Sequence, residues 1–193
     1  MSNMLYVCRH GETSWNAERR IQGRTDIGLN EAGFRQAAIL ADFFRNAHPE
    51  VERVVSSPML RAVQTARATA EALGVPLEVD EDLTEIHTGI FTGKTLDALW
   101  NDPLWQAHLL DPWREGYGEG GESAESVRAR MARVYERYDR AILFSHASPI
   151  RHLLMYLFGI PHEHLYHLVV ANAQATCIEK REGFAKLVYM NRN

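Results

Sequence analysis

The sequence predicts an α/β protein in which helices cover both faces of a mainly parallel sheet. Short runs of β-branched and aromatic residues alternate with longer segments of helical periodicity, a pattern typical of βαβ units. The chain of 193 residues shows no internal repeat, low-complexity tract or domain linker. We therefore expect a single domain over residues 1–193, built as a three-layer α/β/α sandwich with one small inserted cap.

Short apolar runs predict strands at residues 4–9, 52–56, 76–79 and 140–145. The first and last of these runs lead directly into histidines. The end of the chain predicts a hairpin, with strands at residues 175–180 and 184–190 around the turn Arg181-Glu182-Gly183.

Capping residues place the helices between these strands. Asn30 is suited to cap a helix that runs to about residue 46. A second helix is expected to begin with Ser57 as cap and Pro58 at the first position, and to end at Gly74. Further helices are predicted over residues 123–138 and 149–158.

The region from about residue 86 to residue 121 fits this alternation least well, and we interpret it as the inserted cap. It is rich in aromatic residues, among them Phe91, Trp100, Trp105, Trp113 and Tyr117. Such residues form the local core of a small subdomain, and two or three of them can also line a substrate pocket.

Bulk properties exclude several classes of function. A net charge of −4 and a pI near 6.1 give no general attraction to nucleic acid, so an anion site needs local positive charge. The chain has neither the features of a signal peptide nor a membrane-spanning apolar stretch, and we expect a cytoplasmic protein with no membrane partner. Cys8 and Cys177 lie in strand-like runs and are expected to pack in the core. The oligomeric state stays open, with a homodimer among the alternatives.

Three strand ends carry residues suited to phosphate chemistry. Arg9-His10-Gly11 follows the first predicted strand, and ligands in open α/β sheets bind at the carboxyl ends of strands. An imidazole that attacks phosphorus needs one free ring nitrogen, while a guanidinium group grips phosphate oxygens. Arg61 and His146 are expected at the next two junctions of strand and helix. Convergence of these groups would stabilise a transferring phosphoryl group.

Two other motifs carry less weight. Gly93-Lys94-Thr95 resembles the end of a nucleotide-binding P-loop, but the required earlier glycine would fall at Thr88. His162, His164 and His167 form a cluster whose spacing matches no zinc site, so we expect a solvated or capping role and no bound metal.

The chain resembles the histidine phosphatase superfamily, also called the phosphoglycerate mutase-like family, over nearly its whole length. The matching segments occur in family order: Arg9-His10-Gly11-Glu12-Thr13, Trp15-Asn16, Gln22-Gly23-Arg24, Leu29-Asn30-Glu31-Ala32-Gly33, Ser56-Ser57-Pro58, Arg61-Ala62, Glu85-Ile86, Gly121-Glu122-Ser123, Ser145-His146 and Arg151. Two segments depart from the family pattern, Ala147-Ser148-Pro149 after the second histidine and Phe91-Thr92-Gly93 where many members have Trp-Glu-Gly. These departures concern the shape of the pocket more than the type of reaction.

The resemblance implies a role for each matching residue. His10 would become the phosphohistidine, and Glu85 would donate a proton to the leaving oxygen and then activate water. The phosphate or substrate would contact Arg9, Asn16, Gln22, Gly23, Arg61, His146 and Ala147.

The sequence therefore predicts a phosphatase that acts on a small phosphomonoester and needs no cofactor. A phosphoglycerate mutase is the nearest alternative and is the case in which 2,3-bisphosphoglycerate would serve as cofactor. Family mutases are typically longer than this chain, which favours hydrolysis. An inactive phosphate-binding regulatory protein is a third reading, less favoured because His10 and Glu85 are both present.

Overall fold

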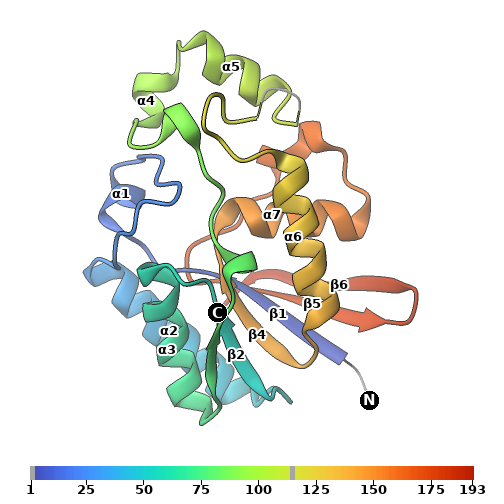
Figure 1. Ribbon diagram of the computed structural model, residues 1–193. Coiled ribbons are helices and arrows are strands. Elements are labelled where there is room, and N and C mark those ends of the chain that lie inside the picture. Colours follow the sequence, from blue (N-terminus) through green and yellow to red (C-terminus); the bar gives the residue numbers. More distant parts are fainter. Residues whose placement is uncertain (1–2, 114–115) are drawn as a thin grey trace.

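The computed structural model describes residues 3–113 and 116–193 and places one six-stranded sheet between two layers of helices (Figure 1). The strands are β1 (Asn3–Arg9), β2 (Arg53–Ser56), β3 (Leu77–Val79), β4 (Ala141–Ser145), β5 (Ala175–Arg181) and β6 (Phe184–Arg192). Their order is β3-β2-β4-β1-β5-β6. The first four strands in this order run parallel, whereas β5 is antiparallel to β1 and β6 to β5. The predicted α/β class and mainly parallel sheet are confirmed.

The predicted helices are also present, with boundaries within two residues of those expected. The helices are α1 (Ser14–Ala17), α2 (Glu31–Ala47), α3 (Leu60–Leu73), α4 (Leu96–Leu99), α5 (Pro103–Leu110), α6 (Ala124–Arg137) and α7 (Ala147–Phe158), with short 3₁₀ helices η1 (Glu81–Leu83), η2 (Gly89–Phe91) and η3 (His162–His167). Within the described part of the chain, no helix is long and apolar enough to cross a bilayer.

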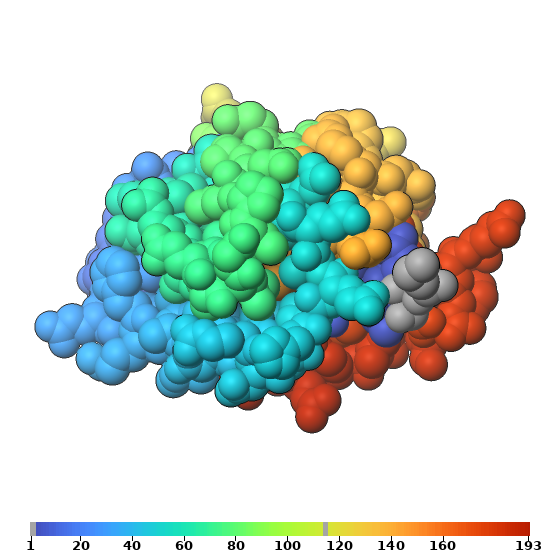
Figure 2. Space-filling view, turned by 90° about the horizontal axis from the view of Figure 1, so that it is seen from below, coloured from blue at the N-terminus to red at the C-terminus, as the bar shows by residue number. Residues whose placement is uncertain are grey.

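Alternation of side chains along the central strands divides the core between the two faces of the sheet. On one face Cys8 of β1 and Phe144 of β4 pack against Phe44 of α2. On the other face Val7 and Leu143 pack in a cluster that contains buried residues of α6 and α7. The helices therefore form the outer layers of the predicted sandwich. Seen from below, α2 and α3, in blue to green, lie on one side and the red β5–β6 hairpin on the other (Figure 2).

The predicted cap of α3 is wrong. The helix begins at Leu60 with Met59 as N-cap and no side-chain cap. The Ser57 hydroxyl group accepts from the amide of Met59 at 3.3 Å, before the helix begins, and lies 2.8 Å from Nε2 of His146. The amide of Leu60, at the start of the helix, donates to Oδ1 of Asp26 at 2.7 Å. Asp26 lies in a loop that comes much earlier in the sequence. Helix α7 likewise begins at Ala147, two residues before the expected start. Its Pro149 falls in the first turn, where the missing N–H has no intrahelical acceptor to lose.

Residues 86–121, interpreted as a cap, lie beyond the carboxyl ends of the central strands in their described part (Figure 1). The segment is closed at its base, because Thr88 and Gly121 form a β-bridge and the amide of Glu122 donates to His87 O at 2.8 Å. Buried Phe91 and Trp105 belong to the same apolar cluster as Val7 and Leu143 of the sheet. Phe91, Trp105 and Tyr117 therefore extend the main core rather than form a separate one, whereas Trp100 is largely exposed.

A close approach of two glycines holds the loop that follows β1. A Cβ atom on Gly33 of α2 would lie only 2.1 Å from Glu12 O, and one on Gly11 would lie 2.7 Å from Gly33 O. The loop is further fixed because the amide of Glu12 donates to Gln36 Oε1 at 2.8 Å and Glu12 O accepts from the amide of Asn30 at 3.0 Å. Helix α2 thus sets the position of the backbone next to His10.

This contact predicts an unusual effect for Gly33→Ala. Helix propensity alone would stabilise the protein by about 1 kcal/mol, whereas the clash with Glu12 should cost about 1–3 kcal/mol and move the loop. We expect a lower free energy of unfolding in urea. Ala38→Gly, on the exposed side of the same helix, reports the propensity contribution by itself. A Gly33→Ala protein more stable than the parent would contradict the close packing.

Candidate active site

His10 stands at the carboxyl end of β1 with its backbone tied to two neighbouring segments. Its amide donates to Ser145 O at 3.1 Å, and its carbonyl accepts from Asn172 Nδ2 at 3.0 Å. Nδ1 lies 2.7 Å from Gly11 O, and because a carbonyl oxygen only accepts, Nδ1 carries the proton. Nε2 then bears the lone pair, and no described residue forms a hydrogen bond to it. The ring is therefore in the tautomer that a nucleophile needs.

His146, the residue before α7, brings a second imidazole to the same place. The centroids of the His10 and His146 rings are 5.1 Å apart, as follows from the adjacent parallel strands β1 and β4. Nε2 of His146 lies 2.8 Å from the hydroxyl oxygen of Ser57, which follows β2. Nδ1 of His146 is buried and has no partner in the part of the chain that the structure describes. Three neighbouring strands thus contribute to one cluster.

Two buried guanidinium groups supply positive charge without an ion pair to any carboxylate that the structure describes. Arg61, in the first turn of α3, is fully buried and donates to Thr25 O at 2.8 Å and to Gly23 O at 2.9 Å. Arg9 donates to Val170 O at 2.7 Å. Nε of each arginine is buried and has no hydrogen-bond partner among residues 3–113 and 116–193. Because carbonyl oxygens orient these groups without neutralising them, their charge is available to an anion.

Glu85 follows η1 and is half-buried beside these groups. Its Oε1 accepts from the amide of Ile86 at 2.9 Å. Burial raises the pKa of Glu85 above its ordinary value, although the charge of Arg61 and the bond from Ile86 oppose this shift. The carboxyl group therefore keeps its proton to a higher pH than a free glutamic acid does.

Burial also determines the charge states of the histidines and of Arg9. It lowers the pKa of His10 well below the usual value, and the positive charges of Arg9 and Arg61 lower it further. The pKa of His146 is lowered by burial and then by Arg61. Burial lowers the pKa of Arg9 to about 10, which still leaves it charged near neutral pH. The cluster thus combines neutral imidazoles with positive guanidinium groups.

A cavity of about 430 Å³ opens beside His10. Its lining includes most residues predicted for the site, namely Arg9, His10, Asn16, Gln22, Gly23, Glu85 and Ala147. Arg61 and His146 are fully buried and do not line it. They lie directly behind this lining. The charge of Arg61 acts on His10, and the His146 ring contacts the His10 ring.

Asn16 and Gln22 are held by the short helix α1 and the loop after it. Asn16 forms a capping box with Thr13, whose amide donates to Asn16 Oδ1 at 3.1 Å. Gln22 Oε1 accepts from the hydroxyl group of Thr13 at 3.0 Å. These bonds use the amide oxygens, so both side-chain NH₂ groups stay available as donors to a phosphate oxygen.

The aromatic residues of the cap segment divide between two places. Trp100 and Trp105 line the cavity beside His10, as does Tyr117. Trp113 does not line this cavity and faces a second one. The prediction that two or three cap aromatics border the main cavity agrees with this arrangement for Trp100, Trp105 and Tyr117.

The sequence interpretation missed a polar group on the far wall of the cavity. Arg151 of α7 donates to Leu168 O at 2.8 Å, and its guanidinium carbon lies 5.6 Å from the centroid of the Tyr166 ring. The hydroxyl group of Tyr166 forms hydrogen bonds with His108 and Tyr117. Arg151 occurs in one of the segments that resemble the family, but the resemblance implies no role for it. No local sequence pattern indicates that η3 folds back onto the cavity.

Comparison with known proteins identifies the family to which this arrangement belongs. The profile of the histidine phosphatase superfamily (branch 1) matches residues 5–193. The "Probable phosphoglycerate mutase GpmB" of Yersinia pestis (strain Pestoides F) is 30% identical over 186 residues, which cover 93% of this chain and 86% of that protein.

Two solved structures show the same fold over nearly their full length. The mycobacterial glucosyl-3-phosphoglycerate phosphatase has a TM-score of 0.85 and 27% identity, covering 99% of this chain and 100% of that one. Phosphoserine phosphatase from Entamoeba histolytica has a TM-score of 0.87 and 25% identity, covering 98% and 97%. The phosphoglycerate mutase-like fold is therefore confirmed, and the chain belongs to the histidine phosphatase superfamily.

Proposed function

We propose that this protein hydrolyses small phosphomonoesters through a phosphohistidine on His10. The observation that carries the proposal is the His10 ring, which donates through Nδ1 to Gly11 O and presents an unprotonated Nε2 beside uncompensated guanidinium groups. A neutral imidazole next to buried positive charge is suited to attack a phosphate ester and to stabilise the transferring group.

In the first step Nε2 of His10 forms a bond to phosphorus while the bond between phosphorus and the ester oxygen breaks. Glu85 gives its proton to the leaving oxygen, which departs as an alcohol. Arg9 and Asn16 hold the phosphoryl oxygens from the cavity lining. Arg61 and His146 have the same role through Nε and Nδ1, which lie just behind that lining and have no partner in the described chain. Because burial raises the pKa of Glu85, this proton stays available to a higher pH than in a free glutamic acid.

In the second step water attacks the phosphohistidine, and the Glu85 carboxylate takes the proton from that water. The bond between nitrogen and phosphorus breaks, inorganic phosphate leaves, and His10 returns to its neutral form. Both steps balance with protein groups and water alone, so the proposal needs neither a metal ion nor an organic cofactor.

Access of water to the cavity favours hydrolysis of the phosphohistidine over transfer of its phosphoryl group back to the substrate. Trp100 lines the cavity and is nevertheless 70% exposed, so the mouth of the cavity opens to solvent. A mutase must keep its phosphohistidine away from water until the substrate has turned over. The names of the two structural relatives, phosphatases for glucosyl-3-phosphoglycerate and for phosphoserine, also favour a small phosphomonoester.

Phosphoglycerate mutase activity stays the second candidate because of the relative from Yersinia pestis. The two activities differ in their products from 3-phosphoglycerate supplied with a trace of 2,3-bisphosphoglycerate. We expect inorganic phosphate, with little 2-phosphoglycerate, and hydrolysis of 4-nitrophenyl phosphate as well. His10→Ala should lower both rates by at least about 10³-fold, since it removes the nucleophile.

The controls for this experiment separate three outcomes. His164→Ala changes an exposed histidine of η3 and should leave the rates unchanged. Conversion of 3-phosphoglycerate to 2-phosphoglycerate faster than phosphate release would establish the mutase. Binding of phosphate esters with no turnover of any of them would establish a binding protein.

If Glu85 is the proton donor, the effect of Glu85→Gln on kcat should depend on the leaving group of the substrate. An alkyl phosphate needs a proton on its leaving oxygen, so its kcat should fall by about 10²–10⁴-fold. Release of 4-nitrophenolate needs no such proton, and we expect a burst of one equivalent because the second step becomes slow. In the parent enzyme, kcat for the alkyl ester should fall as the pH rises through the raised pKa of Glu85.

Rapid-quench measurement of 4-nitrophenolate and of inorganic phosphate tests this prediction. Glu12→Gln, which changes a carboxyl group in the loop after β1 that does not line the cavity, is the matched control. Equal losses for the two substrates without a burst would remove Glu85 from both proton transfers.

A further inference from the structure

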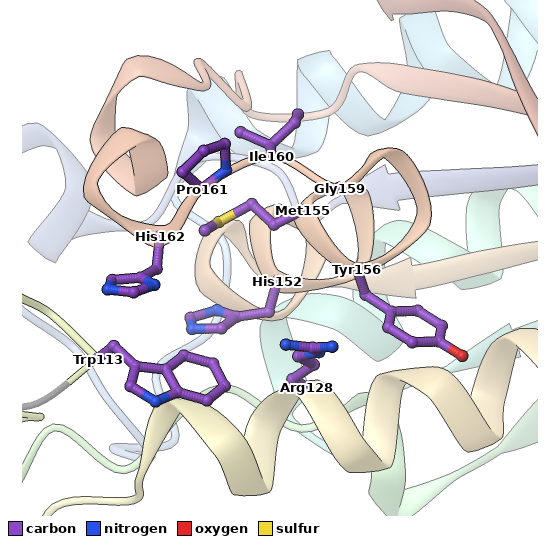
Figure 3. A pocket seen from close by; sticks show the side chains of 9 residues that line it. All are labelled: Trp113, Arg128, His152, Met155, Tyr156, Gly159, Ile160, Pro161 and His162. Carbon is purple, nitrogen blue, oxygen red and sulfur yellow. The ribbon is translucent and has the colours of Figure 1, made fainter.

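A second cavity of about 320 Å³ lies between α6, α7 and the segment that leads into η3. Figure 3 shows the side chains of Trp113, Arg128, His152 and His162 turned toward one another around this space. None of these residues lines the cavity beside His10. A volume of this size lies at the lower end of the range for small-molecule sites.

Arg128 supplies a positive charge that the described residues leave unpaired. Its guanidinium carbon lies 5.7 Å from the centroid of the Trp113 ring and 5.4 Å from that of Tyr156. Other arginines of α6 bind carboxylates, as Arg130 does with Glu122 at 3.0 Å and Arg133 with Asp82 at 2.7 Å. Arg128 forms no such ion pair in the described chain. Two aromatic faces therefore orient a cation that still has its hydrogen-bond donors free.

His152 supplies a hydrogen-bond acceptor in the same cavity. The residue is only 3% exposed, and its Nδ1 donates to Ser148 O at 2.8 Å. Nε2 therefore bears a lone pair, and no described residue binds it. Burial lowers the pKa of His152 to about 4, with Arg130 and Arg151 acting in the same direction. The ring is neutral near pH 7 and accepts from a hydroxyl or N–H group.

The remaining walls suit a flat apolar body. Met155, Ile160 and Pro161 contribute apolar surface. The Trp113 and His162 rings lie 5.7 Å apart at an angle of 33°. Nε2 of His162 lies 3.6 Å from the Asp111 carboxylate. One guanidinium group and one neutral acceptor match a monoanion that carries a donor.

We propose that this cavity binds a small aromatic carboxylic acid that carries a hydroxyl group. The carboxylate pairs with Arg128, the ring packs against Trp113 and the apolar wall, and the hydroxyl group donates to Nε2 of His152. This site is separate from the phosphate site of the proposed function.

The second cavity is connected to the first through the start of α7. Ser148 lines the cavity beside His10, and its carbonyl oxygen is the acceptor for Nδ1 of His152. A ligand on Nε2 polarises this imidazole and strengthens its bond to the turn that carries His146 and Ala147. An effect of the ligand on turnover rests on the proposed phosphatase function, whereas binding itself does not.

Titration of the ¹⁵N-labelled full chain with 4-hydroxybenzoate, followed by NMR, tests the site. We expect saturable shifts at Trp113, Arg128, His152 and Tyr156, unchanged when inorganic phosphate fills the site at His10. Benzoate, which lacks the hydroxyl group, should bind about tenfold more weakly, and so should 4-hydroxybenzamide, which lacks the charge.

Variants assign the contacts. Arg128→Gln should weaken binding of 4-hydroxybenzoate about tenfold, and Arg35→Gln, an exposed arginine on α2 across the sheet, should leave it unchanged. In His152→Phe the preference for 4-hydroxybenzoate over benzoate should disappear, with unfolding measured to confirm the fold. Absence of saturable shifts at these residues up to about 10 mM probe, or shifts centred on His10 that phosphate abolishes, would overturn the proposal.

Discussion

Buried positive charge that is oriented by carbonyl oxygens, and not cancelled by carboxylates, is the constraint on which this site depends. Arg61 is fully buried and makes its hydrogen bonds to Thr25 O and Gly23 O. A buried guanidinium group of this kind lowers the free energy of unfolding, because it loses its hydration without forming an ion pair. Under the proposed function, binding of a phosphate anion would offset that cost, so the charge that destabilises the fold would provide affinity for the substrate. Glu85 stands close enough to raise the pKa of both Arg9 and Arg61, but the described structure holds no ion pair between Glu85 and either arginine.

The order of the strands explains how residues far apart in the chain reach this place. Because β1 lies next to β4 and β4 next to β2, their carboxyl ends lie side by side at one edge of the sheet. His10, His146 and Ser57 follow these three strands directly. Short connections leave little freedom, so the 5.1 Å spacing of the two imidazole rings is largely a consequence of strand pairing. The close contact between Gly11 and Gly33 then fixes the position of Gly11 O, the carbonyl oxygen that accepts from Nδ1 of His10.

The parts of this arrangement that could be predicted from sequence are those with local signals. An apolar run followed by Arg9-His10-Gly11, and another followed by Ser145-His146, indicated both the strands and the edge on which the histidines meet. Tertiary contacts were not predictable in the same way. Asp26 caps α3 although Ser57 looked like the local cap, and the bonds of Tyr166 to His108 and Tyr117 join segments with no shared periodicity. The second cavity depends on the relative position of α6 and α7, which no local pattern encodes.

A crystal structure of the protein with orthovanadate tests the central claim most directly, because vanadate adopts the geometry of a transferring phosphoryl group. We predict vanadium bonded to Nε2 of His10, with vanadate oxygens in hydrogen-bond contact with Arg9, Arg61 and His146. Nδ1 of His10 should keep its bond to Gly11 O. Vanadate bound elsewhere, or held in this cavity without a bond to His10, would contradict the assignment of the nucleophile.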